Sequence, residues 1–267
     1  MPILHLADET TLAYDSLGTG ETLLFLHGVL VSRTEWQPQI QYFAQNYHVI
    51  SCDFRGHGES SASTRPYSVE LFASDIIELL DSLGVKQAIC CGHSFGGMVA
   101  QELALSYPER VRGLILADTV HSAWALPWEA IVSMVMQQTI AQTKSVEDQI
   151  NFAGRYLTMF GPEAEKSFDY VKRETRRYLE DGKTYRNILQ ASFNYSSRAR
   201  LGQIKCPTLI LVGQFFLQTH PHAYEMFWNI RKSQLKFVPK AGHVLNWDNM
   251  AVFNRFVEAF LVDLDKM

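Results

Sequence analysis

A serine held between two glycines is the feature that most constrains how this chain can fold. Residues 92–96 read G-x-S-x-G, with Ser94 at the centre. The apolar stretch 88–91 before them suits a β-strand, and residues 97–105 after them have the composition and apolar spacing of a helix. A strand, a tight glycine-flanked turn and a helix predict a nucleophile elbow. Such a turn lifts the serine hydroxyl above a sheet and points a helix N-terminus at it.

Short apolar runs alternate with helical segments along the rest of the chain. Helices are expected at 68–83 and at about 250–264, and buried strands at 22–26, 48–52, 113–118, 207–213 and 234–238. Uninterrupted apolar strands are typical of a parallel sheet that is covered on both faces. The sequence therefore predicts an α/β fold with a mostly parallel central sheet and helices on both of its faces.

One long stretch interrupts this alternation. Between Asp118 and Cys206 the sequence contains no convincing strand, only helical material rich in aromatic residues and methionine. A helical insertion after a central strand is expected to form a cap over the carboxyl edge of the sheet, where α/β proteins place their sites. We therefore predict a core made of residues 1–118 and 204–267 and a helical cap at 119–203. Trp124 and Trp128 are expected to line a substrate pocket under this cap.

Composition sets broad limits on the class of protein. The 267 residues can bury a full core, and the net charge of −4 gives no reason to expect nucleic acid or an anionic membrane as a partner. No signal peptide is recognisable, and no stretch approaches the roughly 18 apolar residues of a membrane helix, so a cytoplasmic protein is expected. The four cysteines show no metal-site spacing, and no glycine-rich loop suits a phosphate. A small-molecule partner and no cofactor or metal are expected.

A serine nucleophile needs a base, and His243 is the candidate. It follows the last predicted strand, at the sheet edge where Ser94 is also expected. His93, directly before Ser94, is expected to face away from the nucleophile. An ester-cleaving serine also needs N–H donors for the oxyanion. The backbone N–H groups of Phe95, after the serine, and of Val29, in a glycine turn after an early strand, are the predicted donors.

Taken together, these motifs resemble those of the α/β-hydrolase superfamily over essentially the full chain. The motifs are His-Gly at 27–28, D-F-R-G-H-G at 53–58, the elbow at 92–96 and Gly-His at 242–243. Their order and spacing are similar to those of capped serine esterases, haloperoxidase-like enzymes and lactonases. The resemblance implies that Ser94 and His243 are catalytic. It leaves the substrate open, because the superfamily also contains lyases, cofactor-free oxygenases and hormone receptors.

The sequence departs from the family pattern at the acid of the catalytic triad. In most relatives an aspartate stands three residues after the glycine that ends the penultimate core strand. Here that glycine is Gly213, and the acid position holds Phe216. Asp118 is the expected replacement, because it ends the strand after the elbow helix, 24 residues beyond Ser94. This placement is similar to that of haloalkane dehalogenases whose acid follows the same strand.

Two interpretations of this departure remain open. In the first, the protein is a serine hydrolase that cleaves small to medium apolar carboxylic esters or lactones through an acyl-enzyme. Ser94 is then the nucleophile, His243 the base and Asp118 the relocated acid. In the second, the triad is a dyad or a relic, and Phe215 and Phe216 widen the apolar lining of a pocket. The protein is then a non-hydrolytic, receptor-like ligand-binding module, or an altered or engineered hydrolase. A lyase on the same scaffold is a further alternative. We expect the first.

Overall fold

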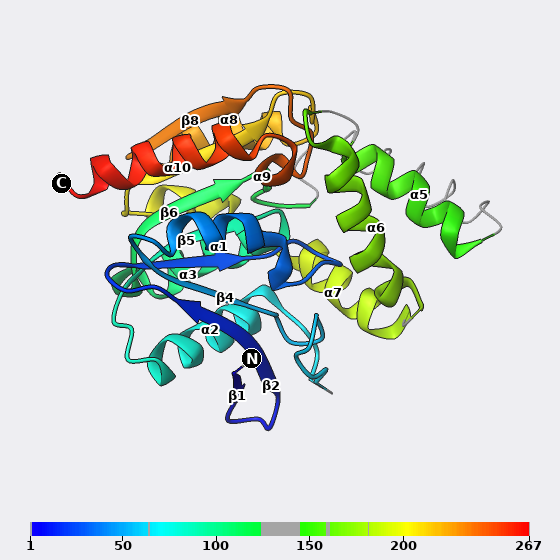
Figure 1. Ribbon diagram of the computed structural model, residues 1–267. Helices are drawn as coiled ribbons and strands as arrows, with labels where there is room; N and C mark the ends of the chain where they lie inside the picture. The colour runs from blue at the N-terminus through cyan, green and yellow to red at the C-terminus, as the bar shows by residue number, and fades with distance from the viewer. Residues whose placement is uncertain (1, 64, 124–144, 159–160, 181, 267) are drawn as a thin grey trace.

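The computed structural model describes residues 2–63, 65–123, 145–158, 161–180 and 182–266, and its centre is an eight-stranded sheet (Figure 1). The strand order is β1-β2-β4-β3-β5-β6-β7-β8. The two N-terminal strands pair antiparallel, and all pairings from β4 to β8 are parallel. The strands are β1 Ile3–His5, β2 Thr11–Leu17, β3 Thr22–Leu26, β4 His48–Cys52, β5 Ala88–His93, β6 Val111–Ala117, β7 Thr208–Gly213 and β8 Ser233–Val238.

The central strands are buried on both faces because side chains alternate along a strand. In β3, Leu24 and Leu26 belong to one apolar cluster, whereas Leu23 and Phe25 belong to the cluster on the opposite face. The first cluster includes side chains of α2 (Val69–Ser82), α3 (Phe95–Ser106) and α8 (His220–Asn229). The second is covered by α1 (Gln37–Phe43) and α10 (Met250–Leu264). Helices on both faces explain why a continuous apolar strand is stable here.

Local signals set the ends of α2. The Ser68 hydroxyl accepts a hydrogen bond from the Leu71 N–H at 3.2 Å, which caps the start of the helix. Gly84 follows the helix with a φ of +67°, the left-handed conformation that glycine adopts without strain. The helix therefore runs over nearly the segment that the sequence predicts.

Three helices of the inserted segment lie beyond the carboxyl ends of the strands. They are α5 (Val146–Leu157), α6 (Ala164–Glu180) and α7 (Gly182–Asn194). Figure 1 shows them on the side of the sheet toward which the β6 and β8 arrows point. A β-bridge between Ser122 and Ser196 joins the two ends of the segment. Trp124 and Trp128, which the sequence assigns to the pocket, lie outside the described residues.

The predicted α/β class is confirmed, and the differences concern peripheral elements. The sequence analysis does not anticipate β1, β2, α1 or α8. Short helical turns also occur at η1 (Arg33–Trp36), η2 (Pro108–Arg110), η3 (Arg198–Gln203) and α9 (Leu245–Asp248). Within the described ranges, no helix is both long and apolar enough to cross a membrane.

Candidate active site

Ser94 occupies the turn between β5 and α3 with a strained backbone. Its φ of +51° lies in the left-handed region, which a non-glycine residue adopts only when its surroundings impose it. The flanking glycines make this possible. A Cβ at Gly92 would lie 2.2 Å from the Gly96 carbonyl oxygen, and a Cβ at Gly96 would lie 2.2 Å from the Leu26 carbonyl oxygen. The G-x-S-x-G pattern is therefore required by close backbone packing.

His243 reaches Ser94 from the loop that follows β8. Its Nε2 atom lies 3.1 Å from the Ser94 hydroxyl oxygen, across 149 residues of sequence. The backbone N–H of His243 donates to the Leu157 carbonyl oxygen at 3.1 Å, so the loop is tied to the end of α5. A serine and a histidine at this distance form a pair in which the imidazole can accept the hydroxyl proton.

The loop after β3 runs directly beside the elbow. A Cβ placed on Gly28 would lie 3.5 Å from the Ser94 Cβ and 3.1 Å from His93 Nδ1, so the loop is in close contact with the elbow. Val29 is the next residue. Phe95 opens α3, and an N–H in the first helical turn has no acceptor within its own helix. The two backbone N–H groups predicted for an oxyanion therefore belong to segments that flank Ser94.

His27 fixes the orientation of the Gly28–Val29 peptide. Its Nε2 accepts the Phe54 N–H at 3.1 Å, so Nδ1 carries the ring proton and donates to the Gly28 carbonyl oxygen at 2.7 Å. Burial lowers the pKa of His27 to about 3, which keeps the ring neutral. Because a trans peptide is planar, holding the Gly28 carbonyl also sets the direction of the Val29 N–H.

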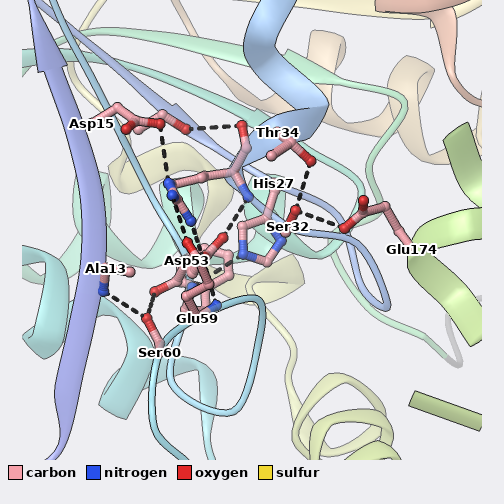
Figure 2. Close-up of polar contacts among 12 residues, drawn as sticks. Ala13, Asp15, His27, Ser32, Thr34, Asp53, Glu59, Ser60 and Glu174 are labelled. Carbon is pink, nitrogen blue, oxygen red and sulfur yellow. Dashed lines mark hydrogen bonds and ion pairs between the residues drawn. The ribbon is translucent and has the colours of Figure 1, made fainter. Parts of the chain in front are cut away.

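A second polar cluster anchors the segment that follows this loop (Figure 2). Asp53 accepts the backbone N–H of Arg33 at 2.7 Å and that of Glu59 at 2.8 Å, and it also pairs with the Arg33 guanidinium. On the other side, the Ser32 hydroxyl donates to Glu174 of α6 at 2.8 Å. The loop that carries Val29 is therefore fixed both to the sheet and to a helix of the inserted segment.

Phe216 lies against the imidazole of His243, as expected from the family position of the acid. The two ring centroids are 4.4 Å apart at an angle of 36°. A phenyl ring cannot accept a hydrogen bond in the way a carboxylate does. Among the described residues, His243 Nδ1 is buried without a hydrogen-bond partner. The usual contact between acid and histidine is thus missing at this position.

The structure does not show the hydrogen bond predicted from Asp118 to His243. One carboxylate oxygen of Asp118 accepts the Gly213 N–H at 2.9 Å, and the other accepts the Thr219 hydroxyl. The carboxylate therefore joins the ends of β6 and β7. Burial raises the pKa of Asp118 to about 8, against the opposing effect of these two hydrogen bonds. Both oxygens of this fully buried carboxyl thus have hydrogen-bond partners other than the imidazole.

Asp248 is a second buried carboxylate close to His243 in sequence. It accepts the Gly242 N–H at 2.8 Å, and burial raises its pKa to about 6. It makes no hydrogen bond with the His243 ring in the described structure. The pKa of His243 is lowered well below its usual value, first by burial and then by the nearby charge of His93. The electrostatics therefore favour a neutral His243.

We expect Asp118→Asn to lower kcat by less than about tenfold, because Asp118 does not contact the imidazole that a triad acid would orient. An asparagine can still accept the Gly213 N–H and donate to the Thr219 hydroxyl. In wild type, the native state retains a proton up to about pH 8 that the unfolded chain loses near pH 4. Stability therefore falls across this window. Asparagine does not titrate, so the variant does not lose stability in this way. The free energy of unfolding of the variant relative to that of wild type should therefore increase from pH 5 to pH 8.

Urea unfolding at pH 5 and pH 8, together with kcat, measures both effects. A loss of several orders of magnitude in kcat with an intact fold would show that Asp118 orients His243 in solution.

Sequence reasoning overlooked a further polar pair beside this site. His93 does not contact the Ser94 hydroxyl, in keeping with the expectation that it faces away, but its ring packs on His243 with centroids 4.7 Å apart. Its Nδ1 lies 2.7 Å from the carboxylate of Glu35 in η1. The sequence offered one signal, a glutamate directly before Trp36. That signal is weak, because only the structure shows that both residues are buried.

The predicted pocket residues are only partly described. Phe216 is buried beside His243, whereas Phe215 is 43% exposed. Within the described ranges, no group of three or more His, Cys, Asp or Glu side chains could hold a metal ion. The arrangement on which chemistry can depend is thus the Ser94–His243 pair with its flanking backbone amides.

Comparison with known proteins places this fold and site in one family. The model of the alpha/beta hydrolase fold family matches residues 21–250. The chain therefore belongs to the α/β-hydrolase family, and it is a hydrolase enzyme.

Similar proteins include several that are named as hydrolases. The chain is 31% identical to 3-oxoadipate enol-lactonase 2 of Acinetobacter baylyi over 98% of both chains. It is 30% identical to (E)-2-((N-methylformamido)methylene)succinate hydrolase of the same organism, over 79% of this chain and 78% of that protein. A solved hydrolase from Pseudomonas aeruginosa superposes with a TM-score of 0.80 at 27% identity, over 97% of each chain.

Proposed function

We propose that this protein is a serine hydrolase that cleaves small to medium apolar carboxylic esters or lactones through an acyl-enzyme. The observation that carries the proposal is the 3.1 Å separation between the Ser94 hydroxyl oxygen and His243 Nε2, at a turn whose strained backbone exposes the serine. Strain of this kind persists only when the surrounding structure imposes it, and it is concentrated at functional sites. The names of the relatives, which include a lactonase and a hydrolase, support the reaction class.

The proposed reaction begins when the Ser94 oxygen attacks the substrate carbonyl. His243 Nε2 takes the hydroxyl proton, and the carbonyl oxygen becomes an oxyanion held by the N–H groups of Val29 and Phe95. Collapse of this intermediate breaks the bond to the alcohol, which receives the proton from His243. Water then attacks the acyl-enzyme with the same base and releases the acid. For a lactone, the alcohol and the acid leave as one open-chain product.

Without a carboxylate beside His243, the transfer of the Ser94 proton to His243 becomes less favourable. When Nε2 accepts the serine proton, the ring proton must sit on Nδ1, for which the described residues offer no acceptor. The other tautomer, with the proton on Nε2, is then favoured, and it cannot act as base. We therefore propose a serine–histidine pair without a carboxylate partner, and a turnover lower than that of a complete triad.

The substrate class follows from the surroundings of the pair. The Phe216 ring lies against His243, and the more exposed Phe215 is its neighbour in the same loop. Aromatic walls favour apolar acyl or alcohol groups over charged ones. We propose that the segment 119–203 caps this site, because its helices lie beyond the carboxyl ends of the strands (Figure 1).

A panel of p-nitrophenyl esters and lactones tests the proposal. The expected result is turnover of acetate and butyrate esters and of simple γ- or δ-lactones. A fluorophosphonate should label one residue, which peptide mass mapping places at Ser94. Labelling at another residue, or no turnover of any ester or lactone by a labelled and folded protein, would contradict the proposed function.

A further inference from the structure

Beside the Ser94–His243 pair lies a buried glutamate–histidine pair that has no part in the proposed chemical steps. Glu35 is 1% exposed and His93 is 3% exposed. The Glu35 Oε1 atom lies 2.7 Å from His93 Nδ1. Two groups of this kind are buried together only when each compensates the other, because an isolated buried charge is costly.

The groups around His93 favour an imidazolium. Its Nδ1 faces the carboxylate of Glu35, and its Nε2 lies 2.9 Å from the backbone carbonyl oxygen of His243. A carbonyl oxygen only accepts, so Nε2 carries a proton, and the Glu35 carboxylate 2.7 Å from Nδ1 favours a second proton on that nitrogen. Burial acts to lower the pKa of His93, but the Glu35 carboxylate outweighs it and the pKa is raised.

The pair connects the two loops that the reaction needs. The second oxygen of Glu35, Oε2, accepts the Gly28 N–H at 2.8 Å, next to the proposed oxyanion donor Val29. His93 holds the carbonyl of His243 itself. In addition, the Glu35 backbone carbonyl accepts the indole N–H of Trp247, four residues beyond His243, at 2.6 Å. One carboxylate residue thus ties the oxyanion loop, the elbow and the histidine loop together.

We propose that Glu35 and His93 are positioning residues for this site, which together hold the His243 loop and the oxyanion loop against the elbow in the absence of a triad acid. The inference rests on the proposed function, since it assigns the pair to the same reaction. It also has an electrostatic consequence. A cation whose ring lies 4.7 Å from His243 opposes protonation of that ring and so keeps the base neutral at lower pH.

The test is Glu35→Gln, which removes the charge and can keep the hydrogen bonds. Its amide oxygen can accept the Gly28 N–H, and its NH₂ group can donate to the Nδ1 of a neutral His93. His93 then still donates from Nε2 to the His243 carbonyl. The expected result is an acidic limb of the kcat/KM profile that moves up by at least about 0.5 pH unit. The plateau of kcat/KM at pH 8–9 should fall less in Glu35→Gln than in Glu35→Ala, because only glutamine can keep the positioning contacts.

Other titratable groups around His93 remain unchanged in this variant. The charge of His93 also acts to lower the pKa of each of its neighbours Asp118, Asp248 and His27. Because these groups are present in both proteins, the shift reports the loss of Glu35. The matched control is Glu225→Gln, which removes the carboxylate from another buried histidine, His121, at 3.1 Å. That variant should leave the acidic limb in place.

A second measurement reports the protonation state of each imidazole ring directly. Ring ¹H–¹⁵N spectra of the wild-type protein at pH 7.5 should show His93 protonated on both nitrogens and His243 neutral. In Glu35→Gln, His93 should become neutral. A neutral His93 in wild type, or kcat/KM profiles that superimpose in wild type and Glu35→Gln, would overturn the inference.

Failure of this inference is distinct from failure of the proposed function. Ester turnover with a neutral His93 would reject the positioning pair and leave the hydrolase proposal intact. An absence of ester and lactone turnover in a protein that holds His93 as an imidazolium would reject the hydrolase proposal, and with it the catalytic role of the pair.

Discussion

Replacing Ser94 with alanine should lower kcat/KM for an activated ester by at least about 100-fold and abolish fluorophosphonate labelling. In serine hydrolases with a complete triad, loss of the serine costs about 10⁶-fold in kcat, and loss of the acid alone costs about 10⁴-fold. Because His243 Nδ1 has no hydrogen-bond partner among the described residues, we expect that less rate enhancement remains to be lost here. Steady-state kinetics with p-nitrophenyl butyrate measure the effect.

His243→Ala provides the companion measurement. If the two residues act as a unit, the double variant should be no slower than either single variant. Full activity in Ser94→Ala would place the nucleophile elsewhere and remove the basis of the mechanism. Circular dichroism checks the fold, which the change should preserve because alanine removes only the hydroxyl.

Phe216→Asp should raise kcat/KM at pH 8 by about 10- to 100-fold, since it supplies a carboxylate beside His243 at the position where most relatives carry the triad acid. The phenyl ring already lies 4.4 Å from the imidazole, and His243 Nδ1 has no partner among the described residues. A carboxylate there would favour the tautomer with the proton on Nδ1 and stabilise the imidazolium formed in the reaction. It would also raise the pKa of His243, so the acidic limb of the profile should move to higher pH.

Phe216→Asn is the matched control, with nearly the same shape as the aspartate and no charge. It should show no gain in kcat/KM. In the Phe216→Asp background, His243→Ala should cost more than in wild type by the same factor that the aspartate gained. An unchanged or lower kcat/KM in a folded Phe216→Asp protein would indicate that His243 is already served by another acid, such as Asp118.

The sequence determined the scaffold and the meeting of Ser94 with His243. Uninterrupted apolar runs predicted the parallel strands, and the final helix occupies Met250–Leu264 as expected. The G-x-S-x-G turn could be predicted because its glycines leave space for backbone carbonyl oxygens, that of Gly96 within the turn and that of Leu26 in β3. Ser94 and His243 could be paired because both follow parallel strands, whose carboxyl ends meet at the same edge of a sheet.

Only the tertiary structure decided which groups the imidazole contacts. A carboxylate at the end of a neighbouring strand made Asp118 a reasonable acid, but its oxygens are directed to Gly213 and Thr219. The pairing of Glu35 with His93 could not be predicted from the sequence either, because the two residues lie 58 positions apart on elements with no shared pattern. Sequence order fixes the strand edge at which a residue lies. Whether a side chain accepts a hydrogen bond there depends on differences of about an ångström in packing, which no local pattern encodes.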